Sequence, residues 1–174
     1  MNMNIRQRHF IKSSEIKALK DEILKRYDQN FVDSLFPKKP RIEVIITEHG
    51  DTLYAINNEL KLWKSKEHGF IPVLTQLINK KIRLKKVVVD MGAIKYITLS
   101  GADIMRPGIT KIDPLIQKGE IIEIVDETHD RSLVVGKALY NGKDMEALKS
   151  GKVIQNLHTI NKSDYIWKFA KEFK

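Results

Sequence analysis

Apolar residues recur at helical spacing near the start of the chain. Ile16, Leu19, Ile23 and Tyr27 lie three or four positions apart, and charged residues fill most of the positions between them. Such spacing places an apolar stripe along one side of a helix, where it can face a core. The pattern therefore predicts a helix over residues 13–30.

Stretches rich in β-branched residues follow, each bounded by turn signals. They predict strands over residues 41–47, 52–56 and 59–63, joined as an antiparallel meander. Pro72 then suits the first turn of another helix, because the missing N–H of proline costs nothing there. These elements together predict a compact α+β domain over residues 1–83.

The rest of the chain has a different pattern, with many short strands and few helices. The expected strands span residues 87–89, 102–105, 120–125, 133–140 and 152–159. Pro107-Gly108 is expected to form a type II turn, and a tail helix is expected after Ser163. Turns at intervals of about eight to twelve residues are typical of a small barrel. The predicted fold class is therefore α+β, with a C-terminal small β-barrel and tail helix over residues 84–174.

The charge of the chain is compatible with a nucleic-acid partner. Its 174 residues include 31 Lys and Arg against 22 Asp and Glu, a formal net charge of +9. Neutralising phosphates releases bound counterions, so a polyanion is the simplest partner for such an excess. Many basic proteins have no such partner, and charge alone leaves both interpretations open.

Composition also bears on the compartment. The chain has no cysteine, which excludes disulfides, thiolate nucleophiles and cysteine metal sites and fits an intracellular protein. No segment approaches the ~20 apolar residues of a membrane span, and the N-terminus lacks the apolar core of a signal peptide. A cytoplasmic protein without a membrane partner is therefore expected.

Catalytic patterns are missing from the sequence. The five histidines are scattered and show neither the HExxH motif nor a spacing that suits zinc. A phosphate-binding Gly-x-x-x-x-Gly-Lys loop and a Gly-x-Ser-x-Gly elbow are also absent. We therefore expect neither catalytic residues nor a metal or cofactor site.

One stretch carries a specific family resemblance. Residues 92–109 closely resemble the signature of PUA domains, which are named after pseudouridine synthases and archaeosine transglycosylases. The shared features are a Gly-Ala opening before a short helix, a Ser-Gly-Ala-Asp turn at residues 100–103, and a Pro-Gly end at residues 107–108. The resemblance implies that the predicted barrel is a PUA domain.

Further segments resemble the malignant-T-cell-amplified-sequence translation factors and their archaeal relatives. Asn156-Leu157-His158, followed by Asp164-Tyr165-Ile166-Trp167, is similar to the ending of those proteins. Gly69-Phe70-Ile71-Pro72 is similar to a segment of their N-terminal α+β domain. The resemblance therefore extends to both predicted domains.

The resemblance implies a non-catalytic protein that binds structured RNA, either rRNA or tRNA, in translation. The small ribosomal subunit and a density-regulated-protein-like chain are the partners that it implies. One alternative is an RNA-recognition subunit of an RNA-modifying enzyme complex, or a ribosome-biogenesis factor. Another is a protein-interaction module that docks a partner on Trp167 and Phe173.

PUA domains typically bind RNA with the first short helix, the strand after it and the last strand, and the residues here suit that role. Gly92 and Gly101 bracket the helix, where free N–H groups and close backbone approach favour a phosphate. Lys95 and Arg106 place a cation on either side. Tyr96 can stack on a base. These residues together predict an RNA-binding ledge flanked by cations.

Several of these residues also have a structural interpretation. Asp103 can accept a hydrogen bond from a base amine or a ribose hydroxyl, or it can bond to its own turn. Tyr96 and Met105 can be core residues, His158 can be structural, and the basic run at residues 80–86 is either a cationic stripe or a solvated linker. The complete set of candidate RNA-binding residues is Lys85, Gly92, Ala93, Lys95, Tyr96, Ser100, Gly101, Ala102, Asp103, Met105, Arg106, Pro107, Gly108, Lys152 and His158.

Overall fold

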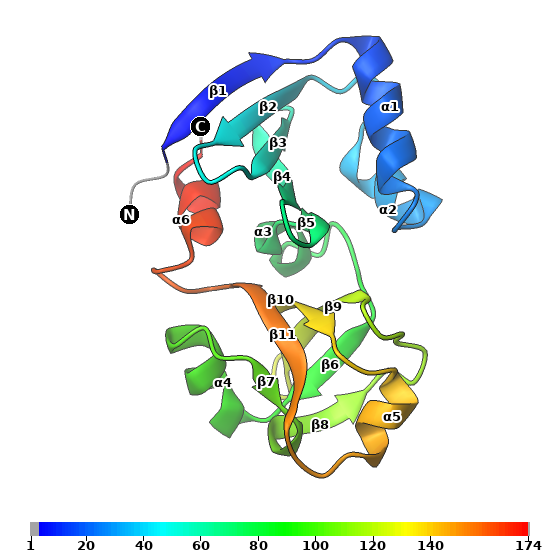
Figure 1. Cartoon of the computed structure of the whole chain (residues 1–174), viewed down its shortest axis with the longest axis vertical. Helices are drawn as coiled ribbons and strands as arrows, with labels where there is room; N and C mark the ends of the chain where they lie inside the picture. The colour runs from blue at the N-terminus through cyan, green and yellow to red at the C-terminus, as the bar shows by residue number, and fades with distance from the viewer. Residues whose placement is uncertain (1–3, 174) are drawn as a thin grey trace. The chain divides into compact units, whose positions relative to one another are not determined.

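The chain folds into two compact units, as a computed structural model shows for residues 4–173 (Figure 1). Of the described residues, 4–82 and 169–173 form the first unit, and 83–168 form the second. Each unit has its own sheet and its own buried apolar residues.

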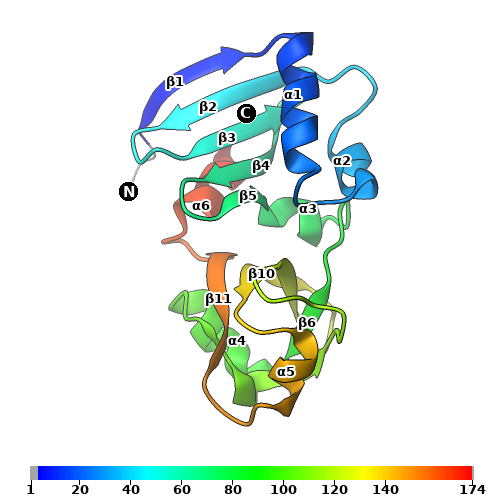
Figure 2. The ribbon, with the colours of Figure 1, turned by 45° about the vertical axis from the view of Figure 1, so that its right-hand side comes forward.

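The first unit is built on a five-stranded antiparallel sheet with strand order β1-β2-β3-β4-β5. Figure 2 shows these strands side by side, with helix α1 lying across them. The central strands agree with the predicted meander, and β1 and β5 extend it at both edges. The strands are β1 (Ile5–Phe10), β2 (Ile42–Thr47), β3 (Thr52–Ile56), β4 (Glu59–Ser65) and β5 (Gly69–Pro72).

Neither edge strand was predicted from the sequence. Every residue of β1 is exposed, so no apolar alternation marks it in the sequence. Pro72 ends β5 at the other edge and does not begin a helix, which corrects the prediction. Proline is tolerated on an edge strand because its missing N–H would face solvent. The next helix, α3 (Leu74–Ile78), begins two residues later.

The region predicted as one helix, residues 13–30, instead contains α1 (Ser13–Ile23) and the start of a second helix, α2 (Gln29–Leu35). Asp28 is the N-cap of α2, and its side chain accepts a hydrogen bond from the Phe31 N–H at 2.8 Å. Tyr27 lies between the helices, stacks on Phe31 and donates to the Phe70 carbonyl at 2.7 Å. The helical spacing of apolar residues therefore continues across the break between the two helices. Tyr27 keeps that spacing because of its contacts with Phe31 and Phe70, although it belongs to neither helix.

The second unit is a nearly closed, barrel-like sheet of six strands in the order β7-β11-β10-β9-β6-β8. Strand β6 pairs in parallel with β9, and all other pairs are antiparallel. The predicted small barrel is confirmed. The strands are β6 (Lys86–Val89), β7 (Ile104–Met105), β8 (Ile109–Ile112), β9 (Ile121–Asp126), β10 (Ser132–Ala138) and β11 (Lys152–Thr159), and the helices are α4 (Met91–Leu99) and α5 (Gly142–Ala147). A last helix, α6 (Tyr165–Glu172), begins in this unit and ends in the first.

Pro107-Gly108 corrects a second local prediction. The two residues belong to a single 3-10 turn, Arg106–Gly108, and do not form a type II turn. That turn leads directly into β8, a strand that the sequence pattern missed. It places residues 106–108 opposite the first turn of α4, because the Asp90 N–H donates to the Gly108 carbonyl at 2.9 Å.

Helix α6 is fixed to the last barrel strand by one carboxylate. Asp164 accepts hydrogen bonds from the Thr159 and Trp167 N–H groups, both at 2.8 Å, and lies 2.9 Å from Nδ1 of the buried His158. Burial alone would raise the pKa of Asp164, but the His158 ring and the hydrogen bonds outweigh it and hold the pKa below its ordinary value. Asp164 therefore caps α6 and links it to β11.

Glycine at position 142 is required by packing. A Cβ there would lie 2.4 Å from the Asp113 carbonyl oxygen, a backbone atom that cannot move aside. We predict that Gly142→Ala lowers the free energy of unfolding by about 1–3 kcal/mol, measured by urea denaturation. Gly92→Ala is the control, because its Cβ would have no neighbour closer than 3.4 Å and alanine favours a helix. Equal stabilities of the two variants would contradict the packing argument.

The cap of α6 predicts a pH-dependent effect on stability. We expect Asp164→Asn to lower the free energy of unfolding near neutral pH by about 1–3 kcal/mol, because a buried network loses its charge. A carboxylate with a depressed folded pKa stabilises above its ordinary value of 3.8 and loses that contribution as the pH falls through the folded pKa. The difference from wild type should therefore shrink in urea titrations below about pH 4. Asp21→Asn, at an exposed position, should show no such difference at either pH.

Candidate nucleic-acid interface

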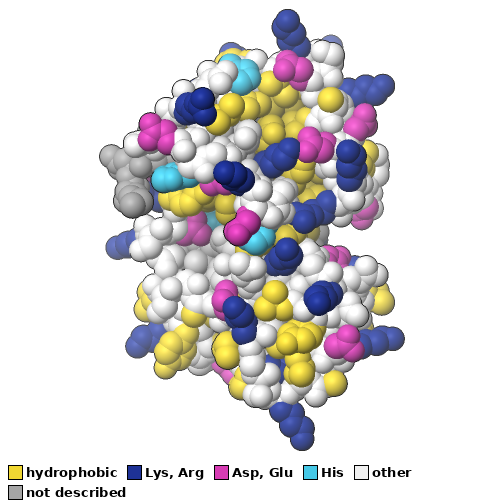
Figure 3. Space-filling view, viewed as in Figure 1, with side chains coloured by type: hydrophobic (Ala, Val, Ile, Leu, Met, Phe, Trp, Pro, Cys, Tyr) yellow, Lys and Arg dark blue, Asp and Glu magenta, His cyan; other side chains and the backbone are white. Residues whose placement is uncertain are grey.

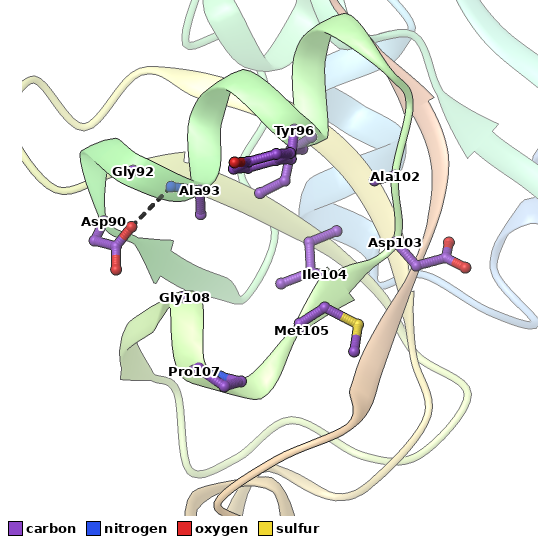
Figure 4. Close-up of a pocket in the computed structure, with 11 residues that line it drawn as sticks. Asp90, Gly92, Ala93, Tyr96, Ala102, Asp103, Ile104, Met105, Pro107 and Gly108 are labelled. Atoms are coloured by element: carbon purple, nitrogen blue, oxygen red, sulfur yellow. Dashed lines mark hydrogen bonds between the residues drawn. The ribbon is translucent and has the colours of Figure 1, made fainter.

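A groove of about 560 Å³ lies in the second unit, between α4 and the segment that runs through β7 and the 3-10 turn (Figure 4). Most of the side chains that line it are apolar, and they come from both of these segments. Two of the lining residues are acidic and none is basic. The lining residues are Asp90, Gly92, Ala93, Tyr96, Ile97, Ala102, Asp103, Ile104, Met105, Pro107 and Gly108.

Close packing of two small residues sets one end of the groove. A Cβ on Gly108 would lie 2.9 Å from the Cβ of Ala93, so the 3-10 turn and the first turn of α4 almost touch. The Asp90-to-Gly108 backbone hydrogen bond holds the same two segments together. Ala93 and Gly108 therefore bring the walls of the groove together, and their role in the structure is packing.

The start of α4 is occupied by the protein's own carboxylates. The Asp90 side chain accepts from the Ala93 N–H at 2.8 Å, and Glu127 accepts from the Met91 N–H at 3.1 Å. A phosphate placed there would meet two negative charges instead of free N–H groups. The start of α4 at Gly92 is therefore capped by two carboxylates, which disfavours a phosphate there.

Large apolar side chains are exposed around the groove. Tyr96 is 67% exposed, Leu99 70%, Met91 52% and Met105 51%, and Figure 3 shows hydrophobic side chains on the side of this unit that carries α4. Their exposure excludes the core role that was the alternative for Tyr96 and Met105. Exposed aromatic and thioether groups beside an apolar groove form a surface suited to a flat, partly apolar ligand.

Asp103 connects the groove to the last strand of the barrel. Its side chain accepts from the Asn156 N–H at 2.8 Å and lies 3.3 Å from Nζ of Lys152; Figure 4 shows it pointing toward β11. Asn156 in turn donates to the carbonyls of Ala102 and Ile97, at 3.0 and 3.3 Å. Asp103 thus bonds to β11. The structural interpretation of the sequence instead predicts a bond to the backbone of its own turn.

Asn156 was not among the candidate residues, although its amide ties α4 and the turn after it to β11. Little in the sequence signals it, because β11 also contains other polar residues, Gln155 and His158 among them, and an amide there does not stand out. Gly101, in the same turn, has a φ of +64°, and a Cβ there would meet nothing within 4 Å. Glycine is therefore needed at this position for its conformation. Ser100, beside it, is the exposed C-cap of α4.

Three candidate cations are engaged elsewhere in the fold. The Arg106 guanidinium donates to the carbonyls of Ile109, Met145 and Glu146 at 3.2, 2.9 and 3.4 Å. Lys85 forms an ion pair with Glu120 at 2.8 Å. The side chain of His158 is fully buried against Asp164. In this structure Arg106 is therefore held by backbone carbonyls, His158 is buried, and Lys85 is paired with a carboxylate, so these three do not form part of the proposed contact surface.

Lys95 and Lys152 are the candidate cations that remain accessible. Both are exposed, and Lys152 is paired with Asp103 at the surface. Lys95 has no ion-pair partner among residues 4–173. The site is thus an apolar groove with one free cation on α4 and one paired cation on β11.

The described part of the chain offers neither a metal-binding cluster nor a membrane-spanning helix. Among residues 4–173 there is no group of three His, Cys, Asp or Glu side chains placed to hold a metal ion. In the same range, no helix has both the length and the apolar character needed to span a bilayer.

Two family models match the chain. The model of the PUA domain matches residues 85–160, and the model of the Pre-PUA-like domain matches residues 1–87. The two matched regions correspond to the barrel and to the five-stranded sheet described above.

Relatives and a solved structure match along almost the whole chain. An uncharacterized protein of Methanocaldococcus jannaschii is 38% identical, over 96% of this chain and 99% of its own length. Translation machinery-associated protein 20 of Saccharomyces cerevisiae is 32% identical, over 97% and 96%. The crystal structure of a hypothetical protein of Pyrococcus horikoshii superposes with a TM-score of 0.79 at 26% identity, covering 94% of this chain and 99% of that one. The chain therefore belongs to the family of Pre-PUA and PUA proteins that includes translation machinery-associated protein 20 and the malignant T-cell-amplified sequence proteins.

Proposed function

We propose that this chain is a non-catalytic RNA-binding protein that acts with the translation machinery. It contacts rRNA or tRNA through the groove beside α4. The observation that carries this proposal is an open, mainly apolar groove in a PUA domain, with Tyr96 exposed at its side. The name of one relative, translation machinery-associated protein 20, supports a role in translation.

The lining of the groove favours an unpaired base over a phosphate. Apolar walls of this size suit the flat face of a base, and stacking on an aromatic side chain contributes roughly 1–3 kcal/mol. Two carboxylates already cap the helix start, where a phosphate would otherwise bind. Sequence-reading proteins generally recognise unpaired RNA bases in loops and at ends. The groove is therefore proposed to take a single-stranded nucleotide.

The backbone of that nucleotide is proposed to lie toward the two accessible cations. Lys95 lies beside Tyr96 on α4, and Lys152 lies on β11 next to Asp103. Approach of a phosphate would draw Lys152 away from Asp103, whose freed carboxylate oxygen could then accept from a base amine or a ribose hydroxyl. Lys152 and Asp103 would thus act together at the groove.

The wider biological setting is proposed on the strength of the family. Association of the relatives with the translation machinery supports action on the small ribosomal subunit in the cytoplasm, together with a partner chain of the density-regulated-protein kind. The +9 net charge of the chain also suits a large RNA target.

The groove makes a direct prediction for RNA binding. Tyr96→Ala should weaken binding of a fluorescent RNA hairpin with a single-stranded 3′ tail by about tenfold, because stacking on one base is lost. Lys95→Glu should weaken it several-fold and reduce the dependence of affinity on salt. Fluorescence anisotropy over a series of KCl concentrations measures both effects.

Two control variants match these changes away from the groove. Leu115→Ala removes another exposed large apolar side chain, and Lys118→Glu makes the same charge change at another exposed position. Neither should alter binding of the tailed hairpin beyond about twofold. If Tyr96→Ala and Lys95→Glu bind as their controls do, the groove is not the RNA site.

The translation setting has its own test. Wild-type protein should sediment with purified small ribosomal subunits through a sucrose gradient, and the Tyr96→Ala/Lys95→Glu double variant should remain largely at the top. A protein that binds the tailed hairpin but ignores ribosomal subunits would contradict the translation role and favour the recognition subunit of an RNA-modifying complex.

A further inference from the structure

A second cluster of cations lies in the first unit, at one end of its five-stranded sheet. The connection from α2 to β2 carries Lys38, Lys39 and Arg41, and no acidic residue occurs from residue 34 to residue 42. All three cations are exposed. This connection and the residues around it, described next, are called the Lys38 surface.

The connection is restrained on both sides. Pro37 and Pro40 flank the two lysines, and the fixed φ angle of proline reduces the conformational freedom of the segment. At its end the Arg41 N–H donates to the Asn57 side chain at 2.8 Å, and the Asn57 N–H donates back to the Arg41 carbonyl at 2.9 Å. The turn between β3 and β4 therefore holds the segment in place.

Neighbouring elements add two further cations to the Lys38 surface. Nζ of Lys20, on α1, lies 5.3 Å from the centre of the Phe36 ring, at the start of the connection. Lys12 follows Ile11, whose N–H donates to the Ile42 carbonyl at 3.1 Å, next to Arg41. Figure 3 shows Lys and Arg side chains projecting from this unit over α1.

Most charges of the Lys38 surface are not neutralised within the protein. Within residues 4–173, no ion pair involves Lys12, Lys20, Lys38, Lys39 or Arg41. Elsewhere in the same unit, by contrast, Arg8, Lys64 and Lys81 pair with Glu43, Glu22 and Glu59. The nearby Glu15 carboxylate accepts from the Lys12 backbone N–H at 2.8 Å and offsets one of the five charges. Five cations and one carboxylate around a restrained loop leave a locally positive potential.

The make-up of the Lys38 surface indicates what it binds. Four of its five cations are lysines, which are depleted in the cores of protein–protein interfaces. Its one large exposed apolar side chain among the described residues is Phe10, which the Arg41 guanidinium covers at 4.2 Å from the ring centre. Nucleic-acid interfaces are much more positive and more polar than protein interfaces. We infer that the Lys38 surface is a second RNA-binding site, which holds the sugar–phosphate backbone of a duplex without reading its sequence.

This inference goes beyond the groove and does not require it. The groove is apolar and takes an unpaired base, whereas the Lys38 surface is cationic and takes phosphates. A blunt RNA duplex of about 20 base pairs is therefore the probe, because it offers phosphates and no unpaired base. Failure of the groove proposal would leave duplex binding unchanged.

We expect Lys38→Glu/Lys39→Glu to weaken binding of the blunt duplex by at least about threefold near physiological salt. It should also lower the slope of log affinity against log salt by about two, since each lost phosphate contact removes nearly one unit. Anisotropy titrations of the full chain from low to moderate KCl measure both quantities. Tyr96→Ala should bind the duplex as the wild type does.

The matched control is Lys25→Glu/Lys66→Glu, which makes the same charge change at two exposed positions of the same unit. These residues lie outside the Lys38 surface, at the far end of α1 and in the turn between β4 and β5. Equal affinities and salt slopes for the two double variants would overturn the inference, because only net charge would then matter. It would also be overturned if Lys38→Glu/Lys39→Glu lost binding to poly-L-glutamate but kept the duplex, since the surface would then serve an acidic protein.

Discussion

The hydrogen bond from the Ala93 N–H to the Asp90 side chain organises the proposed site. It caps α4 directly after β6, and the N–H of the same Asp90 donates to the Gly108 carbonyl on the other side of the groove. Together with Glu127, it places two carboxylates at the start of the helix. The groove beside α4 has mainly apolar walls. The proposed preference for a base over a phosphate thus rests on a cap that the protein supplies itself.

Many of the cations in this basic chain serve the fold. Arg106 bridges three backbone carbonyls, and Lys85 is paired with Glu120. The Arg106 guanidinium is held by these carbonyls and the charge of Lys85 is offset by Glu120, so neither is proposed to contact a phosphate. The proposed RNA contacts rest instead on cations that have no ion pair among the described residues and that lie at the two proposed sites, namely Lys95 beside the groove and the five cations of the Lys38 surface.

Much of the fold could be predicted from the sequence, and the exceptions have physical causes. Most strands of the barrel were predictable because buried aliphatic runs between turns leave a clear pattern, whereas β8, with two exposed residues at its centre, was missed. Strand β1 was missed because all its residues are exposed, and the break after α1 was missed because Tyr27 keeps helical spacing while it is anchored outside a helix. Local patterns report burial well, whereas edge pairing depends on residues far apart in the sequence.

The sequence indicates which segment forms the groove, but it does not indicate most of the contacts that the residues of that segment make. The segment from Gly92 to Gly108 does form the groove, because a contiguous stretch with small residues at the points of closest approach leaves a mark in the sequence. The partners of Arg106 and His158 could not be predicted, since they come from α5 and from the start of α6. Whether a cation faces solvent or a carbonyl depends on long-range packing that residue type alone does not report.

The two proposed RNA surfaces differ in the free energy that each supplies. The groove offers stacking and shape, which depend on an unpaired base and only weakly on salt, whereas the Lys38 surface offers counterion release, which depends on salt and not on sequence. Each surface belongs to a different unit and draws on a different physical term, so a change at one is expected to leave the free energy supplied by the other unaltered.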